Sequence, residues 1–313
     1  MATRRSAPAL RADAKAIFRA GLDSVRAKKA IPAFVDIEKM RGATGPATSP
    51  GTRRGERLKI GKRRFKLPAN GRLIVTGAGK ASAHMARALE RILGRRIDGG
   101  ILVTQKGHAV PCQRVEIIEA SHPVPDAAGI KAAKRIGKLL DDAGKDDLVI
   151  CLLSGGGSAL LPAPAQGITL KDKRQTTEAL LKAGAPIEAL NCVRKHLSRL
   201  KGGQFAQRAH PARLVTLAIS DVVGDPFDVI ASGPTCGDPT TFADARRELK
   251  HYGVWRAIPD NVRKLIENGA AGKIADTPEP SDPVFGHVHN FIVANNDAAL
   301  KAAAAEARRR GFR

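Results

Sequence analysis

The stretch DLVICLLSGGG, residues 147–157, decides the fold of this chain. Its apolar part, residues 148–153, runs without polar alternation and leads through a serine into three glycines. Such a run is typical of a strand that is buried on both faces, as strands are inside a parallel sheet. Glycines at the carboxyl end of that strand lie where open α/β sheets bind ligands, and they let backbone N–H groups wrap an anion. A tight turn without a ligand is the alternative interpretation.

The segments on either side of this strand predict an α/β fold. Residues 72–93 contain a short apolar strand, a glycine-rich turn and a helix, which form one βα unit. Further strand-like and helical segments alternate along the chain: strands at 99–104, 114–121, 213–220 and 291–295, and helices at 127–142, 170–183, 186–200, 240–275 and 296–310. A mostly parallel sheet covered by helices is the fold class that this order predicts.

The first 69 residues differ in composition from the remainder. Residues 1–40 are predicted to form an N-terminal helical segment, because apolar residues recur within 9–31 at helical spacing. Residues 41–69 are interpreted as a basic insertion or linker, and the part 41–66, rich in glycine, proline and basic residues, as a stretch from which no core can be built. Residues 70–313 then form the α/β domain. Another strand should follow the last helix, so this domain is interpreted as cut short at its C-terminus.

Charge and cysteine content restrict the class of protein. The net charge is +23, and residues 1–66 hold 18 Lys or Arg against 5 Asp or Glu. A basic arm can bind nucleic acid by counterion release, but one Trp and one Tyr offer little base stacking, so we predict a solvated arm and no specific nucleic-acid partner. Four dispersed cysteines, no signal peptide and no apolar run of membrane length predict a cytoplasmic protein with reduced thiols and no membrane partner.

Lys80 follows the first glycine-rich turn, GAGK, about where a helix begins. Ile74 stands where a Walker A motif needs its first glycine, and Ser82 stands where a dinucleotide fingerprint needs its third. What is left is a glycine turn that presents a lysine at a helix N-terminus, a place that favours anions. A solvated lysine at a helix start is the alternative.

Other polar residues also lie at predicted strand ends. Asp221 and Asp225 follow the strand 213–220, and carboxylates so placed commonly hold Mg²⁺ beside a nucleotide, although an Asp-rich turn is the alternative. His122 follows the strand 114–121 and either faces a ligand or has a structural role in its loop. Arg194 and Lys201 belong to a basic segment that ends at a glycine pair, a second place where an anion could bind.

Five blocks, taken in order, resemble the glycerate 2-kinase family, whose members are often labelled hydroxypyruvate reductase: GAGKASAHMARALE (77–90), IEASHPVPDAAG (118–129), LLSGGGSALL (152–161), NCVRKHLSRLKGG (191–203) and ISDVVGDPFDVIASGPT (219–235). The resemblance covers about residues 70–313. It implies a Rossmann-like three-layer sandwich and the phosphorylation of D-glycerate at its 2-hydroxyl, with ATP and Mg²⁺, to 2-phosphoglycerate. The family's smaller C-terminal domain, with an active-site arginine, has no counterpart in these residues.

The resemblance also implies roles for particular residues. Lys80 matches the active-site lysine of the family, and Ser154, Gly155, Gly156, Gly157 and Ser158 match a loop expected to hold nucleotide phosphates. Asp221 and Asp225 match an acidic motif, where Mg²⁺ binds or the glycerate hydroxyl is activated, so Asp221 is a catalytic candidate as well as a metal ligand. Arg194 and Lys201 match basic positions, and their charge and position make them candidates for binding a carboxylate or phosphate of the substrate; His122, from its place after a strand, is a further substrate-binding candidate.

Two alternatives belong to other functional classes. An NAD(P)H-dependent hydroxypyruvate reductase would need a GxGxxG loop and an acidic residue about 20 positions further on, and neither glycine-rich loop has them. A non-catalytic, basic protein that associates with nucleic acid on an inactive kinase core is the second alternative, suggested by the net charge. A homodimer is also expected, because apolar surface made for the missing domain would be exposed.

Overall fold

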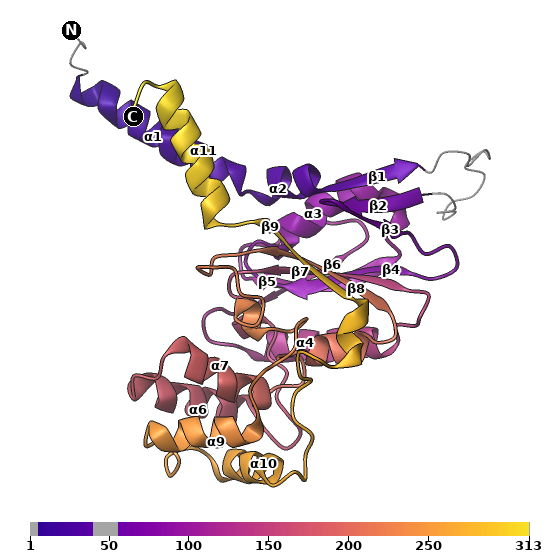
Figure 1. The fold of residues 1–313 in the computed structure, drawn as a ribbon, viewed down its shortest axis with the longest axis vertical. Coiled ribbons are helices and arrows are strands. Elements are labelled where there is room, and N and C mark those ends of the chain that lie inside the picture. Colours follow the sequence, from indigo (N-terminus) through magenta and orange to yellow (C-terminus); the bar gives the residue numbers. More distant parts are fainter. Residues whose placement is uncertain (1–5, 40–55, 313) are drawn as a thin grey trace.

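A six-stranded parallel sheet forms the centre of the computed structural model, which describes residues 6–39 and 56–312 (Figure 1). Its strands are β4 (Leu73–Ala78), β5 (Gly99–Gln105), β6 (Glu116–Ala120), β7 (Leu148–Ser154), β8 (Arg213–Ile219) and β9 (Val288–Ala294). Across the sheet they follow the order β6-β5-β4-β7-β8-β9, so the chain winds outward from β4 in one direction and from β7 in the other. This is the doubly wound Rossmann order, and the predicted α/β fold is confirmed.

Helices cover both faces of this sheet, because successive side chains of a strand point to opposite faces. One face packs against α3 (Ser82–Leu93) and contributes Leu73, Val75, Leu148, Ile150 and Leu152 to a common core. The opposite face packs against α4 (Ala127–Asp141) and α8 (Gln204–Ala209), and contributes Ile74, Ala78, Val149, Cys151 and Leu153. Every residue of β4 and β7 is buried, which explains why the sequence of β7 shows no polar alternation.

The N-terminal region contains a second, smaller sheet that the sequence did not predict. Strands β1 (Val35–Lys39), β2 (Glu56–Ile60) and β3 (Arg63–Lys66) pair antiparallel in that order. Leu58, Ile60 and Phe65 are buried in the core shared with α3. The expectation that no core could be built from residues 41–66 is therefore wrong for residues 56–66, where buried apolar residues alternate with basic ones that are partly or fully exposed. Residues 40–55, also part of that expectation, lie outside the described residues.

Four helices form a lobe of their own below the sheet (Figure 1). They are α6 (Leu170–Lys182), α7 (Ile187–His196), α9 (Phe242–His251) and α10 (Asp260–Ala270). Their apolar side chains make a separate core, which includes Leu180, Leu190, Val193, Leu249 and Ile266. The predicted helix at 170–183 and the helical region 240–275 are confirmed, and the helix predicted at 186–200 is present but ends at His196. The separation of these helices from the sheet was not predicted.

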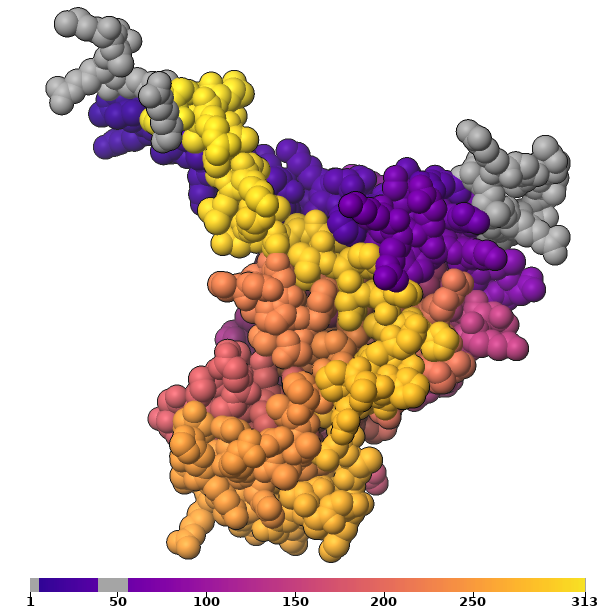
Figure 2. Space-filling view, in the orientation of Figure 1, coloured from indigo at the N-terminus to yellow at the C-terminus, as the bar shows by residue number. Residues whose placement is uncertain are grey.

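Two helices from opposite ends of the described chain project from the body of the molecule (Figures 1 and 2). Helix α1 (Ala7–Ser24) packs along α11 (Asn296–Arg309), and Arg310 Nη1 lies 2.7 Å from Asp13 Oδ1. Between α1 and β1 lies α2 (Ala27–Phe34), which contacts α3. None of the described helices combines the length and the apolar character that a membrane crossing requires.

Candidate functional site

The two glycine-rich turns lie side by side at the carboxyl edge of the sheet. One follows β4 and the other follows β7, the adjacent strands from which the chain winds in opposite directions. Ligands bind at this switch point in open α/β sheets because the loops diverge there and leave a crevice. The backbone N–H of Lys80 donates to the carbonyl of Gly155 (2.9 Å), and that of Ala81 donates to the buried Ser154 Oγ (2.9 Å). These two hydrogen bonds tie the lysine turn to the loop 154–158.

Close contacts leave room only for glycine at positions 155 and 156 of that loop. Gly156 has a φ of +84°, and a Cβ there would lie 2.9 Å from His122 Cδ2 and 3.4 Å from Lys80 Cε. A Cβ at Gly155 would lie 2.1 Å from Asp221 Oδ2. Side chains that follow three different strands therefore converge on the loop, and the missing Cβ atoms are what let them approach.

His122 lies between opposite charges. Burial lowers the pKa of His122, and the ammonium of Lys80 lowers it further, while the carboxylate of Asp221 raises it. The net direction is downward, so His122 is largely neutral near pH 7 and offers one N–H donor and one acceptor to a ligand. Lys80, His122 and Asp221 thus present a cation, a neutral ring and an anion around one loop.

Asp225, the second predicted metal ligand, lies further along the turn that follows β8. Its backbone is left-handed, with a φ of 56°, and its Oδ2 accepts a hydrogen bond from Asn295 Nδ2 at 2.5 Å. In the part of the chain that the structure describes, no three His, Cys, Asp or Glu side chains are grouped to hold a metal ion. The hard oxygens of Asp221 and Asp225 suit Mg²⁺ chemically, but that ion would also need oxygens from a bound phosphate or from water.

A pocket of about 400 Å³ opens beside the loop. Its polar lining includes His122, Ser158 and four cationic side chains: Lys173, Arg174, Arg194 and Lys201. Apolar groups from the 122–125 loop and from α6 complete its walls, among them Pro123, Val124, Pro125 and Leu181. Arg194 and Lys201, predicted to bind an anion, therefore lie in the same pocket as His122.

A chain of hydrogen bonds holds Ser158, the last residue of the loop 154–158, in place. Lys201 Nζ donates to the carbonyl and to the hydroxyl of Ser158, at 2.7 and 2.9 Å. Ser158 Oγ lies 2.9 Å from Ser232 Oγ, and Ser232 donates to Asn191 Oδ1 at 3.0 Å. Ala231 and Ser232 both have left-handed backbones (φ 53° and 63°), a conformation that costs free energy in residues with a Cβ and is concentrated at functional sites.

Lys173 is a member of this pocket that the sequence did not reveal. It lies within LKDKRQTT, a polar stretch that resembles an exposed helix, yet its side chain is buried and Nζ donates to the Leu197 carbonyl at 2.7 Å. Burial, together with the positive charge of Arg194, lowers the pKa of Lys173 to about 7. No pattern in the sequence could have found it, because its burial depends on how α6 packs against α7 and the loop that follows.

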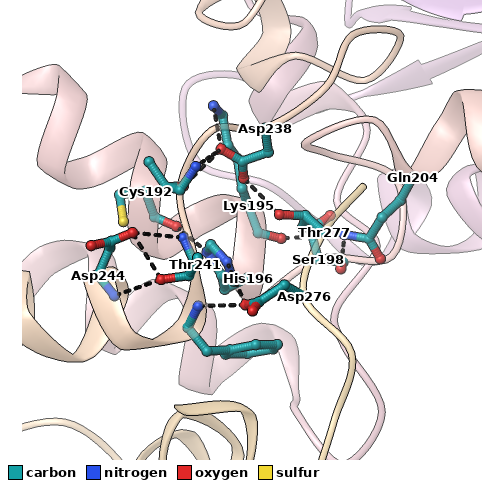
Figure 3. A network of polar contacts seen from close by, with 12 residues as sticks. Cys192, Lys195, His196, Ser198, Gln204, Asp238, Thr241, Asp244, Asp276 and Thr277 are labelled. Carbon is teal, nitrogen blue, oxygen red and sulfur yellow. Dashed lines mark hydrogen bonds and ion pairs between the residues drawn. The ribbon is translucent and has the colours of Figure 1, made fainter. Parts of the chain in front are cut away.

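Helix α7 is fixed by a different network, shown in Figure 3. Lys195 Nζ lies 3.1 Å from Asp238 Oδ1, and both side chains are almost fully buried. Thr240 and Thr277 donate further hydrogen bonds to the same carboxylate. Since neighbouring residues on a helix point about 100° apart, holding Lys195 in this network helps to direct Arg194 toward the pocket.

Fold and site together define a class of protein. It is a doubly wound α/β protein whose switch point carries a glycine loop, a lysine and an acidic residue, an arrangement suited to a ligand that bears phosphate. A family profile described as a domain of unknown function (DUF4147) matches residues 13–267, and the chain belongs to that family.

Curated relatives confirm the resemblance seen in the five sequence blocks. The chain is 45% identical over 243 residues to the glycerate 2-kinase of Pyrococcus horikoshii, and 41% identical over 242 residues to the D-glycerate 2-kinase of Thermotoga maritima. It is also 50% identical over 237 residues to an Agrobacterium vitis protein provisionally named hydroxypyruvate reductase. These matches cover 78%, 77% and 76% of this chain but 54%, 55% and 52% of the relatives, so the chain spans about half their length.

Solved structures agree with this fold. A crystal structure of a Pyrococcus horikoshii OT3 protein superposes with a TM-score of 0.81 at 38% identity, covering 97% of this chain and 64% of that one. The crystal structure of glycerate kinase from Thermotoga maritima gives a TM-score of 0.77 at 35% identity, with the same two coverages.

Proposed function

We propose that this chain carries the nucleotide-binding part of a glycerate 2-kinase, which transfers a phosphoryl group from ATP to the 2-hydroxyl of D-glycerate and forms 2-phosphoglycerate. The observation that carries the proposal is the convergence of Lys80 and Asp221 on the loop 154–158 at the switch point of the sheet. Phosphoryl transfer requires positioning and charge stabilisation more than covalent chemistry, and this site offers both. The names of the relatives support the same reaction.

Each residue at the loop has a task that fits its chemistry. The Lys80 ammonium is a compact charge on a flexible stem, which can follow the phosphoryl group as negative charge develops on it. Ser154, Gly155, Gly156, Gly157 and Ser158 would hold phosphate oxygens. Asp221 is exposed and acidic, so it can accept the proton of the glycerate hydroxyl or bind Mg²⁺ together with Asp225. When bound, Mg²⁺ would supply positive charge to the phosphates of ATP.

The acceptor is proposed to bind near His122. Its neutral ring lies next to Lys80 across Gly156, so it can exchange hydrogen bonds with a hydroxyl of glycerate without repelling a nearby cation. Arg194 and Lys201 provide positive charge in the same pocket, and their ligand is either the glycerate carboxylate or a phosphate. A cytoplasmic location, a homodimer and the lack of a specific nucleic-acid partner stay predictions.

A hydroxypyruvate reductase is the second candidate, because the sheet has the strand order of dinucleotide-binding folds and some relatives bear that name. The details of the turn do not support it. Ser82 occupies the third glycine position and its hydroxyl donates to the carbonyls of Gly79 and Val103, so a side chain fills the helix–strand contact. Strand β5 ends at Gln105 and Lys106 follows, which leaves no acidic residue there for a ribose.

Two assays run in parallel test the proposal. D-glycerate with ATP and Mg²⁺ is followed by ADP release, and hydroxypyruvate with NADH is followed by loss of absorbance. We expect ADP release that depends on glycerate, and no oxidation of NADH. Oxidation of NADH without ADP release would replace the kinase by the reductase.

A further inference from the structure

Three basic side chains that line the 400 Å³ pocket, Lys173, Arg194 and Lys201, are buried or partly buried, and none of them is paired with a described acid. Lys173 is 8% exposed and Lys201 is 4% exposed, and Arg194 is partly buried. Among the described residues, no Asp or Glu side chain pairs with any of the three, and no carboxylate raises their pKa values. Buried charges in proteins are normally paired, because burying an unpaired charge costs several kcal/mol. The described residues therefore provide no acid that balances these three basic groups, and an anionic ligand would do so.

The three groups also repel one another. Burial, followed by the charges of Lys173 and Arg194, holds the pKa of Lys201 well below its usual range. Burial also lowers the pKa of Arg194, and Arg194 in turn lowers that of Lys173. An anion that enters the pocket would relieve this repulsion, so part of its binding free energy is already stored in the protein.

Many N–H donors in the pocket are still free to bind such an anion. An ammonium has three donors and a guanidinium has five. Lys201 gives two of its donors to Ser158, and Lys173 gives one to the Leu197 carbonyl. Within the described chain, the guanidinium of Arg194 makes no hydrogen bond. The remaining donors need a ligand with several acceptor oxygens.

We propose that Lys173, Arg194 and Lys201 form one site for the polyphosphate chain of the nucleotide. Charge decides between this ligand and the carboxylate of glycerate. A carboxylate carries one negative charge and two oxygens, whereas a polyphosphate chain as a whole carries several negative charges and many oxygens that accept strong, charge-assisted hydrogen bonds. Because Lys201 holds Ser158, the site is continuous with the loop 154–158 that is expected to bind phosphate.

This inference rests on the proposed kinase function and makes it more specific. It assigns Arg194 and Lys201 to the phosphate donor instead of the glycerate carboxylate, and it adds Lys173 as a binding residue. The other ionisable groups that line the pocket are His122, Arg174 and Glu178. Glu178 is exposed and is the only acid among the described lining residues, so the pocket keeps an excess of positive charge.

Calorimetric titration of the chain with pyrophosphate, and separately with D-glycerate, tests the proposal. The variant is Lys173→Met, and the matched control is Lys171→Met, an exposed lysine on the same helix. We expect Lys173→Met to weaken pyrophosphate binding about 10- to 100-fold, the usual range for losing a hydrogen bond to a charged group, and Lys171→Met to leave it unchanged. D-glycerate affinity should be the same in all three proteins.

Three results would overturn the proposal: no binding of pyrophosphate by the parent chain, equal pyrophosphate affinity in parent and Lys173→Met, or a loss confined to D-glycerate. The last would assign the cations to the acceptor. Removing an unpaired buried charge should leave the melting temperature equal or higher. If Lys173→Met does not fold, Arg194→Gln is used instead, because the Arg194 side chain is only partly buried. That variant must then lose pyrophosphate affinity and keep its D-glycerate affinity.

The test of the polyphosphate site and the test of the kinase function can fail independently of each other. Pyrophosphate binding that depends on Lys173, in a protein that never phosphorylates glycerate, would keep the polyphosphate site and reject the proposed acceptor. Phosphorylation of glycerate by a protein whose pyrophosphate affinity ignores Lys173 would keep the kinase and reject the polyphosphate site.

Discussion

Two buried groups of positive charge meet at helix α7, and they differ in what balances them. Lys195 is paired with Asp238, and both side chains are almost inaccessible to water (Figure 3). Arg194, the preceding residue, lines the pocket with Lys173 and Lys201, and none of the three has an acidic partner in the described chain. The same turn of helix α7 thus contributes one cation to a region where an acid balances it and another to a region where none of the described acids does.

The difference teaches how to separate structural from functional charge. A buried ion pair with its hydrogen bonds satisfied is complete by itself, so removing one partner harms the fold. A buried cation without a partner destabilises the fold until a ligand arrives, so removing it should harm binding and spare stability. The substitution at Asp238 tests the structural side of this contrast, and three further substitutions test the catalytic loop and a helix cap; they follow from the largest expected effect to the smallest.

Asp238→Asn should cause the largest loss. The asparagine keeps the shape of the side chain but leaves Lys195 charged, buried and unpaired, which costs about 3–5 kcal/mol of unfolding free energy. Urea denaturation measures it. Asp141→Asn is the control, because Asp141 pairs with Arg208 at the surface with its side chain 52% exposed and should change stability by less than about 1 kcal/mol. A similarly small loss at Asp238 would show that the paired region is not structural.

Lys80→Ala should act on turnover and not on stability. We expect phosphorylation of glycerate to slow by about 10²–10³-fold, the range for losing one group that stabilises charge in the transition state. The melting temperature should not change, because the hydrogen bond from Lys80 to Gly155 uses the backbone, which alanine keeps. The measurement is a coupled ADP assay, with the exposed Lys145→Ala as control. Near-parental turnover would remove Lys80 from the mechanism.

Gly156→Ala should disturb the loop where Lys80 and His122 meet. The left-handed φ of +84° costs about 1–2 kcal/mol for a residue with a Cβ, and the added carbon would lie 2.9 Å from His122 Cδ2. Urea denaturation and titration with a non-hydrolysable ATP analogue should both detect the change. Gly144→Ala is the matched control, since a Cβ there meets nothing within 4 Å. Equal behaviour of the two variants would mean that the loop adapts freely.

Asp126→Ala should have the smallest effect and a pH signature. Burial alone would raise the pKa of Asp126, but the Gly129 N–H and the Ser121 hydroxyl donate to its carboxylate and bring the pKa to about 2, from an ordinary value of 3.8. A lowered folded-state pKa gives stability that is present above pH 4 and lost as the pH falls toward 2. Losing this helix cap costs about 1 kcal/mol at pH 7. Denaturation at pH 7, 3 and 2 should show the gap between variant and parent closing; a constant gap would argue against the cap.

Local patterns predicted the elements well where they were unambiguous. The apolar run 148–153 lies in β7 (Leu148–Ser154), and the helix predicted at 127–142 is α4 (Ala127–Asp141). The prediction of a linker is wrong at residues 56–66, although glycine and basic residues favour one by composition. The alternation of Leu58 and Ile60 with charged neighbours is typical of a strand with one buried face.

The sequence by itself determined which segments are strands of the central sheet, where the glycine turns lie, and that Lys80 stands at one of them, because each of these depends on residues that are close in the chain. Only the tertiary structure decided that Asp221 approaches Gly155 and that Lys173 lies buried beside Arg194. Which strand ends become neighbours is set by the order of strands across the sheet. Whether a charge is buried or solvated depends on what packs over it, and that packing comes from segments far away in the sequence.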